Sequence, residues 1–260
     1  MKESPPYIRE ERGDAWSKWW KMEVQPAGYN YSRDRGIPEV ELRIRLLRGR
    51  LASRPREKDS RLLEVGVGSG ETAIMAAELF TEVTCVDPEE RNLRPVEERL
   101  RQLGISTVTF IQGRIEEARL AQEGYDAILL QNILEHLENP VQVLLRLAAF
   151  LRPRGLMHIC VPLANSLHRA LGLEMGLISH LEELAASDRA YGHFRVYTAS
   201  LLRRQVRSAG LRIHYEQPFY LKPLPTGFLT PLPAEVHQAL FSLGQKFPEW
   251  ASYLYLEAGV

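Results

Sequence analysis

Short apolar runs alternate with stretches of helical spacing over residues 61–163, and this alternation constrains the fold more than any other feature of the chain. The runs read RLLEVGV, EVTCVD, VTFIQG, YDAILLQN and LMHICVPL. Strands that alternate with helices form βαβ units, whose right-handed crossovers place parallel strands in one sheet with helices on both faces. The runs are apolar almost throughout, as burial on both faces requires. The sequence therefore predicts a doubly wound α/β domain.

Helical stretches connect these runs, and two more strands are predicted towards the carboxyl end. Asn139 and Pro140 predict where one helix begins, and Gly155 predicts where it ends. The predicted helices cover residues 71–80, 91–104, 115–122, 140–155 and 198–210, and the further strands cover residues 211–221 and 251–259.

Two segments stand outside the alternation. Residues 163–194 form a polar insert after the fifth strand, and long connections in compact domains are usually functional or disordered. We interpret residues 1–50 as an N-terminal helical cap and residues 51–260 as one α/β domain, whose insert covers the substrate. The cap aromatics that we expect to close over the mouth of the site are Trp19, Trp20, Tyr29 and Tyr31.

Charge limits the partners. Lys plus Arg equals Asp plus Glu, at 33 each, so the formal net charge is zero and nucleic acid is disfavoured as a partner. The run RIRLLRGRLASRPR at residues 43–56 holds six arginines and no acid. Its apolar residues recur at helical spacing, which predicts an amphipathic helix with a solvated arginine face.

The cysteines and the hydropathy of the chain indicate its compartment. Cys85 and Cys160 are too few for a disulfide framework and lack metal-ligand spacing, so we expect buried free thiols in a reducing environment. No apolar run approaches the length that spans a bilayer. We therefore expect a cytoplasmic protein with no membrane partner.

A glycine loop joins the first predicted strand to the first predicted helix. Gly66, Gly68 and Gly70 form G-x-G-x-G, whereas the dinucleotide fingerprint needs G-x-G-x-x-G and Glu71 occupies its last glycine position. Glu71 would repel a pyrophosphate at this helix start, and no Lys-Ser/Thr pair follows as in a P-loop. The loop therefore predicts a ligand without a phosphate near it.

Two carboxylates flank this loop. Glu64 ends a strand that should be buried, where a carboxylate needs a partner such as an ammonium group. Asp87 ends the second strand, about twenty residues beyond the loop, where it can accept hydrogen bonds from ribose hydroxyls. An amine, a ribose and no phosphate between them describe S-adenosylmethionine.

Residues 61–210 resemble the class I S-adenosylmethionine-dependent methyltransferases. LLEVGVGSGETA is similar to their first motif, VTCVDPEE to the acidic motif of their second strand, FIQGRIEEA to their third motif and YDAILLQNILEHLENP to their fourth-strand segment. Arg114 stands where the third motif commonly has Asp. The resemblance implies a Rossmann-like, doubly wound seven-stranded sheet of order 3-2-1-4-5-7-6 with an antiparallel last strand. It also implies a cofactor site formed by Glu64, Gly66, Gly68, Gly70, Asp87, Pro88, Arg114, Ile115, Gln131 and Asn132.

Two segments are candidates for the chemistry. QNILEHLENP resembles the E-x-L-E-H stretch of the ubiquinone-pathway O-methyltransferases, where acidic residues and a histidine can hold a metal; here Asn132 replaces the first glutamate, so we expect no metal. GHFRVYT resembles a segment of bacterial small-molecule and sugar methyltransferases, and its alternate residues can share one side. The candidate catalytic residues are His136, His193, Arg195 and Tyr197.

The sequence thus predicts an S-adenosylmethionine-dependent methyltransferase that acts on an oxygen or nitrogen of a small molecule, such as a metabolite, a sugar or a natural-product intermediate. Alternatives are an RNA or protein methyltransferase and a non-catalytic cofactor-binding scaffold. Complete first and second motifs argue against the scaffold, and QNIL argues against methylation of a base amine, for which Asn/Asp-Pro-Pro-aromatic is expected. The sequence leaves a homodimer open.

Overall fold

The computed structural model describes residues 36–55, 58–120 and 124–260. The predicted cap residues Trp19, Trp20, Tyr29 and Tyr31 lie outside the described residues. Within the described ranges, no helix is long and apolar enough to cross a membrane.

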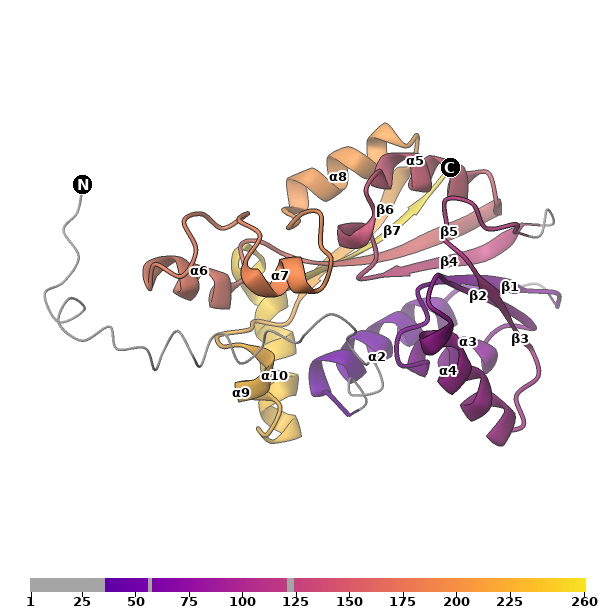
Figure 1. Ribbon diagram of the computed structural model, residues 1–260, viewed down its shortest axis with the longest axis horizontal. Helices are drawn as coiled ribbons and strands as arrows, with labels where there is room; N and C mark the ends of the chain where they lie inside the picture. The colour runs from indigo at the N-terminus through magenta and orange to yellow at the C-terminus, as the bar shows by residue number, and fades with distance from the viewer. Residues whose placement is uncertain (1–35, 56–57, 121–123) are drawn as a thin grey trace, which may run out of the picture.

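A seven-stranded sheet of order β3-β2-β1-β4-β5-β7-β6 runs through the molecule (Figure 1). The first five strands pair in parallel, and β7 is antiparallel to both β5 and β6, so the predicted topology is confirmed. The strands are β1 (Arg61–Val65), β2 (Glu82–Asp87), β3 (Val108–Gln112), β4 (Tyr125–Gln131), β5 (Leu151–Pro162), β6 (Arg212–Phe219) and β7 (Tyr253–Gly259).

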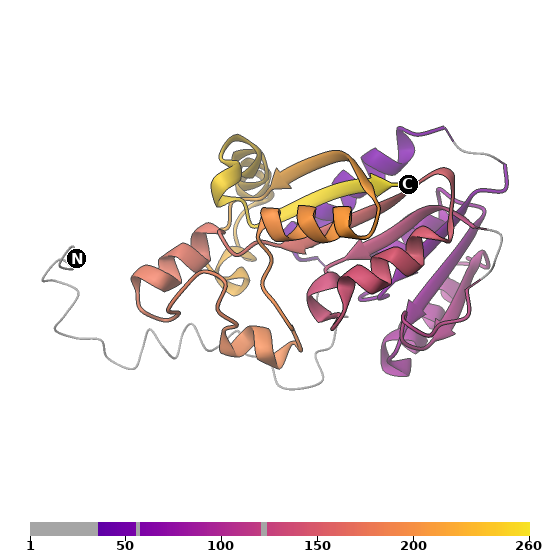
Figure 2. The ribbon, with the colours of Figure 1, turned by 90° about the horizontal axis from the view of Figure 1, so that it is seen from above.

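Helices cover both faces of this sheet (Figures 1 and 2). One face packs against α5 (Pro140–Ala148) and α8 (Ala199–Ser208). The other face carries α2 (Pro38–Ala52), α3 (Glu71–Ala77), α4 (Glu90–Gln102) and α10 (Ala234–Lys246). The remaining short helices are α6 (Leu167–Glu174), α7 (Ala186–Ala190), α9 (Thr226–Leu229), η3 (Leu134–His136) and η4 (Pro248–Trp250).

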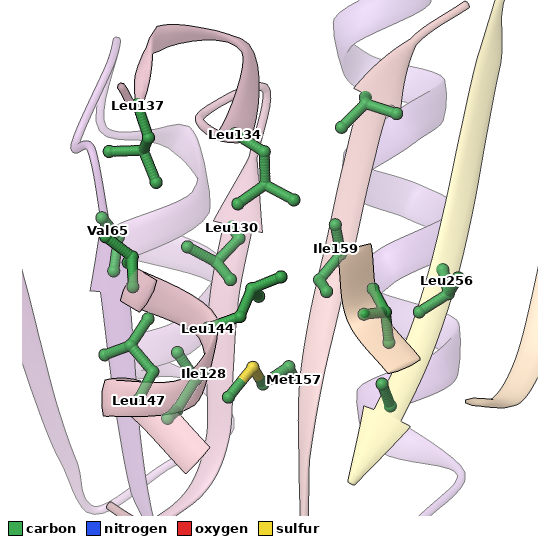
Figure 3. Close-up of a cluster of buried hydrophobic side chains, with 14 of the residues drawn as sticks. Val65, Ile128, Leu130, Leu134, Leu137, Leu144, Leu147, Met157, Ile159 and Leu256 are labelled. Atoms are coloured by element: carbon green, nitrogen blue, oxygen red, sulfur yellow. The ribbon is translucent and has the colours of Figure 1, made fainter. Parts of the chain in front are cut away.

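Alternate residues of each strand feed two separate cores, because side chains of a strand point to opposite faces. Leu62 belongs to the core under α2, α3 and α4, whereas Leu63 and Val65 belong to the core under α5 and α8. Figure 3 shows the second core, where Leu144 and Leu147 of α5 meet the strands. Burial on both faces explains the continuous apolar runs in the sequence.

The helix predicted over residues 140–155 ends earlier than expected. It begins after Asn139 as predicted, but α5 ends at Ala148, and Gly155 lies inside β5 instead of capping a helix. A Cβ on Gly155 would lie 2.7 Å from the Tyr125 carbonyl oxygen, so the close approach of β4 and β5 requires this glycine. The helix predicted over residues 115–122 was also wrong, because its described residues form only a turn.

The arginine-rich segment forms α2, but its arginine face is not wholly solvated. Arg50 donates two hydrogen bonds, of 2.7 and 2.9 Å, to the carboxylate of Glu257 on β7, and Arg54 donates a third, of 3.0 Å. Glu257 is fully buried, and the Tyr255 hydroxyl also donates to it, at 3.0 Å. The buried carboxylate therefore fixes the carboxyl end of α2 to the sheet.

Candidate active site

One cavity of about 580 Å³ opens at the carboxyl ends of the parallel strands. The glycine loop after β1 and the end of β4 form one part of its wall, at the point where the strand order reverses. In doubly wound sheets this position is where ligands bind. The amino end of α2, the insert after β5, the segment around α9 and the start of β7 form most of the remaining wall, so both predicted substrate-covering regions contribute to it.

The glycines of the loop shape the cavity floor. Gly66 and Gly70 have φ angles of 80° and 82°, and a Cβ on Gly66 would collide with Ile133, while one on Gly70 would lie 2.6 Å from Val96. Gly68, with φ of 50°, would place its Cβ in open space. Glycine tolerates these left-handed conformations, and the loop leaves room for a ligand above Gly68.

Asp87 is buried at the end of β2, and its carboxylate is held from three sides. One oxygen accepts a hydrogen bond from the Val67 N–H at 3.1 Å. The other accepts from the Glu89 N–H at 2.9 Å and from the Asn92 amide at 3.1 Å. A carboxylate offers roughly four acceptor positions, so one is left, on the oxygen bonded to Val67, for a ligand hydroxyl. The predicted contact of Asp87 with the ribose hydroxyls stays a prediction, and the three protein hydrogen bonds fix the carboxylate that would make it.

Glu64 is buried at the end of β1 and also lines the cavity. Its burial raises the pKa of its carboxyl group to about 8, and the Cys85 thiol donates to it across 3.4 Å. Both cysteines are buried free thiols, as predicted. Glu64 is therefore uncharged at neutral pH, as expected of a buried carboxyl group that has no cationic partner beside it.

Two amide side chains at the end of β4 present unpartnered acceptors. Asn132 adopts a left-handed φ of 55°, which asparagine tolerates, and its N–H donates to the Cys160 carbonyl at 2.9 Å. Gln131 donates from its amide nitrogen to the His158 carbonyl at 2.8 Å. The side-chain oxygens of both residues are buried without a partner within the described chain, and both residues line the cavity. Such atoms are ordinarily satisfied by a ligand or by water.

Glu135, His136 and His193 form a cluster whose potential ligand atoms all lie within 4.8 Å of one another. Burial raises the pKa of Glu135 to about 7, and one of its carboxyl oxygens has no partner within the described residues. Burial and the neighbouring His193 lower the pKa of His136 to about 4, so this imidazole is neutral. The two histidine rings meet edge to face, with centroids 4.6 Å apart.

Both histidines are oriented by a second partner. The Nδ1 atom of His193 lies 3.3 Å from a carboxylate oxygen of Asp188, and His136 hydrogen-bonds to the backbone of Tyr191. Metal-binding histidines usually have such an outer partner on the nitrogen that does not face the metal. The cluster therefore fits a divalent ion, with one carboxylate and two imidazoles as ligands.

Sequence reasoning missed this arrangement. His136 and His193 were both predicted as catalytic residues, but nothing in the sequence indicated that their rings meet beside Glu135; the expectation of no metal, based on Asn132, stays a prediction. The N–H of Phe194 donates to the Glu135 carbonyl at 2.8 Å, which brings the two distant segments together. Asp188, the partner of His193, was not predicted as a site residue.

Arg195 and Tyr197 hydrogen-bond to the backbone of η3, which carries Glu135 and His136. The Arg195 guanidinium donates to the carbonyl oxygens of Leu134 and Glu138, at 3.0 and 2.9 Å, and also to that of Leu137. Tyr197 is fully buried outside the cavity wall, and its hydroxyl donates to Gln205 at 2.7 Å. Arg195 lines the cavity and also holds η3, whereas Tyr197 lies outside the wall and donates to the Leu134 carbonyl at 3.4 Å, so the catalytic role predicted for both stays a prediction.

Three residues predicted to contact the cofactor do not line this cavity. Pro88 is exposed, Ile115 is buried in the core under α5 and α8, and Arg114 pairs with Glu116 at 2.9 Å while 62% of its side chain is exposed. The other predicted cofactor residues, including Glu64, Asp87 and Asn132, do line it.

Comparisons with known proteins show the family of this chain. Residues 39–216 match a family described as a methyltransferase domain. A ubiquinone biosynthesis O-methyltransferase of Methylocella silvestris is 30% identical over 148 residues, which cover 54% of this chain and 56% of that protein. The chain thus spans about half the length of this curated relative.

Solved structures share the fold at low identity. A methyltransferase from Mesorhizobium loti, dependent on S-adenosylmethionine, superposes with a TM-score of 0.57 at 17% identity, covering 81% of this chain and 95% of that one. The cyclase SpnF superposes with a TM-score of 0.58 at 17% identity, covering 82% and 79%. At such identities the likeness shows the fold alone, and one fold hosts more than one chemistry.

Proposed function

The chain belongs to the methyltransferase-domain family of class I S-adenosylmethionine-dependent enzymes, and we propose that it transfers a methyl group to an oxygen or nitrogen of a small molecule. Its cofactor is S-adenosylmethionine. The observation that carries the proposal is that one cavity joins the glycine loop to the Glu135–His136–His193 cluster. A methyl donor on the loop and an acceptor at the cluster would share this cavity.

The residues of the loop fit the cofactor. Asp87 would accept from a ribose hydroxyl through its remaining acceptor position, and Glu64 would receive the ammonium group of the methionine part. The open space above Gly68 allows close approach of the ligand to the backbone. The sulfonium is itself a strong electrophile, so the protein mainly aligns the acceptor for in-line displacement and excludes water.

The cluster would bind the acceptor atom. Glu135, His136 and His193 are the residues that would hold a divalent ion, which as a Lewis acid lowers the pKa of a bound hydroxyl. Asp188 keeps the His193 ring in place through the hydrogen-bonding distance of 3.3 Å. Arg195 fixes the η3 turn, which positions Glu135 and His136.

The state of Glu64 makes cofactor binding depend on pH. The free protein holds a proton on Glu64 up to about pH 8, whereas the cofactor's ammonium group favours the ionised carboxylate. Binding at neutral pH should therefore release about one proton, and affinity should rise as the pH rises from 6 to 8 and then level off. Calorimetry in buffers of different ionisation enthalpy measures the proton count. Glu64→Gln is the control, and release of the proton by that variant would contradict the assignment.

Metal dependence is a second expected result. Treatment with EDTA followed by desalting should lower turnover several-fold, and Mn²⁺ or Zn²⁺ should restore it, because one carboxylate and two imidazoles suit these ions better than Mg²⁺. Metal content before and after chelation is measured by mass spectrometry. Full activity of metal-free protein would show that the cluster works without an ion, as the sequence analysis expected, with His193 and Asp188 left as an acid–base pair.

The transfer itself is tested on metabolite pools. Protein and S-adenosylmethionine are incubated with the small-molecule fraction of a cell extract, and mass spectrometry searches for a CH2-shifted product that needs both. Absence of such a product, together with methylation of RNA or of a protein fraction, would favour the alternative acceptors. Failure of the intact protein to bind S-adenosylmethionine would remove the proposal altogether.

A further inference from the structure

The cavity wall contains a polar group that the proposed transfer does not use. Glu39 and Arg43 come from α2, Lys222 and Thr226 come from the segment around the start of α9, and Tyr253 begins β7. All five line the same cavity as the glycine loop and the cluster. We call these five residues the lysine subsite.

Lys222 is the unusual member of this subsite. Its side chain is buried, and its ammonium donates to the Thr226 hydroxyl at 2.6 Å. The Thr226 hydroxyl in turn donates to Glu39 at 2.9 Å, so the nearest bonded carboxylate is one residue removed. Within the described residues no carboxylate lies within 4.0 Å of this ammonium. A buried cation without a direct counter-charge is costly, and two of its N–H donors are left for a ligand.

Arg43 adds a second cation to the cavity wall. It follows Glu39 by one turn of α2, so the two side chains lie on the same side of the helix. Across the described ranges Arg43 makes no hydrogen bond and no ion pair. Its charge helps to lower the pKa of Glu135, which places the guanidinium within electrostatic range of the cluster. Because it has no hydrogen-bonded partner in the described residues, it can bind an anion without breaking a hydrogen bond.

Two unpartnered polar atoms complete the wall. One carboxylate oxygen of Glu39 is buried without a partner in the described chain, while the other accepts from Thr226 and from the Tyr253 hydroxyl at 3.2 Å. The Nδ1 atom of His168 is likewise buried and unpartnered there, and burial holds the pKa of this histidine well below its usual range. Glu39 needs a donor and Lys222 needs an anion, so a ligand that offers only apolar groups leaves both unsatisfied.

From this arrangement we infer that the methyl acceptor carries an anionic group, a carboxylate or a phosphate, bound by Lys222 and Arg43, together with a hydroxyl or amine that donates to Glu39. The inference rests on the proposed function, because the acceptor is taken to occupy this cavity. It adds a substrate class, an acidic hydroxylated or aminated small molecule, which the comparisons do not supply.

Anion binding tests the subsite without turnover. Protein saturated with S-adenosylhomocysteine is titrated with inorganic phosphate and, separately, with acetate at constant ionic strength, by calorimetry. We expect one of these anions to bind at a single site, and Lys222→Gln and Arg43→Gln each to raise its Kd at least tenfold. Arg204→Gln is the matched control, because Arg204 is exposed on α8 and its loss removes the same charge away from the cavity. Phosphate and acetate distinguish the two sources of the anionic group.

The outcomes separate this inference from the proposed function. Thermal midpoints and cofactor affinity check that the variants fold; if Lys222→Gln does not, Arg43→Gln decides. Binding of neither anion, or an equal loss in Arg204→Gln, overturns the inference. A methylated product from the metabolite pool that an anion exchanger fails to retain at pH 7 would also overturn the inference. Retained anion binding without any methylated product would sink the proposed function and leave the anion site standing.

Discussion

Replacement of His193 by alanine should lower kcat/KM for the acceptor about a hundredfold, which corresponds to about 2.7 kcal/mol of transition-state stabilisation. His193 is the member of the cluster that comes from the insert, and its loss leaves Glu135 and His136 without their third neighbour. The affinity for S-adenosylmethionine should change less than twofold, because His193 does not touch the glycine loop in our assignment. Steady-state kinetics and calorimetry measure the two quantities separately.

His180→Ala is the matched control for this variant. It removes an exposed histidine from the same insert, outside the cavity wall, and should leave both quantities unchanged. Asp188→Asn tests the positioning of the ring and should cost less than the loss of His193 itself. A fully active, folded His193→Ala, or one that loses cofactor affinity instead, would show that the cluster is not where the acceptor binds.

Replacement of Asp87 by alanine should weaken the binding of S-adenosylmethionine and of its demethylated product about 10- to 100-fold, or about 1.4–2.7 kcal/mol. The variant loses the carboxylate that would accept a hydrogen bond from the ligand. It also leaves the N–H groups of Val67 and Glu89 without their acceptor. The loop between β1 and α3 therefore loses an anchor as well as a contact. Calorimetry on the purified variant measures the change.

Asp87→Asn separates charge from shape at this position. It keeps an oxygen for the loop and nearly the same volume, so its loss of affinity should fall between those of the native protein and Asp87→Ala. Unaltered affinity in Asp87→Ala would remove Asp87 from the cofactor site. Tight binding of NAD by the native protein would point to dinucleotide chemistry instead.

The sequence was sufficient for features that depend on local rules. Continuous apolar runs report burial on both faces, and the position of the glycines between a strand and a helix reports a left-handed loop. The sequence also indicates that Glu64 and Asp87 lie near each other, because the ends of adjacent parallel strands meet at one edge of the sheet. The order of the last two strands came from the resemblance to a family, since no local rule fixes which strands become neighbours.

The sequence failed where contacts between distant segments decide. Residues 193–197 alternate, so His193, Arg195 and Tyr197 were expected on one side, but the chain there pairs with Leu163 only through an isolated bridge and Tyr197 turns into the core. Gly155 looked like a helix end because a close approach between two strands has no local signature. Lys222 also has no signature, because the absence of a direct carboxylate partner for its ammonium within the described residues depends on what surrounds it in space.

The two ends of helix α2 have different roles. Its carboxyl end is held by the buried Glu257, while Glu39 and Arg43 reach the cavity from its amino end. At a rise of about 1.5 Å per residue, Arg43 and Arg50 stand about 10 Å apart along the axis. Evolution can thus replace Glu39 and Arg43, which contact the acceptor in our proposal, and leave the contact of Arg50 with Glu257 unchanged. Related enzymes that diverge in substrate should vary at the start of this helix and agree at its end, and a combinatorial library confined to positions 39 and 43 is where a new acceptor preference can be sought.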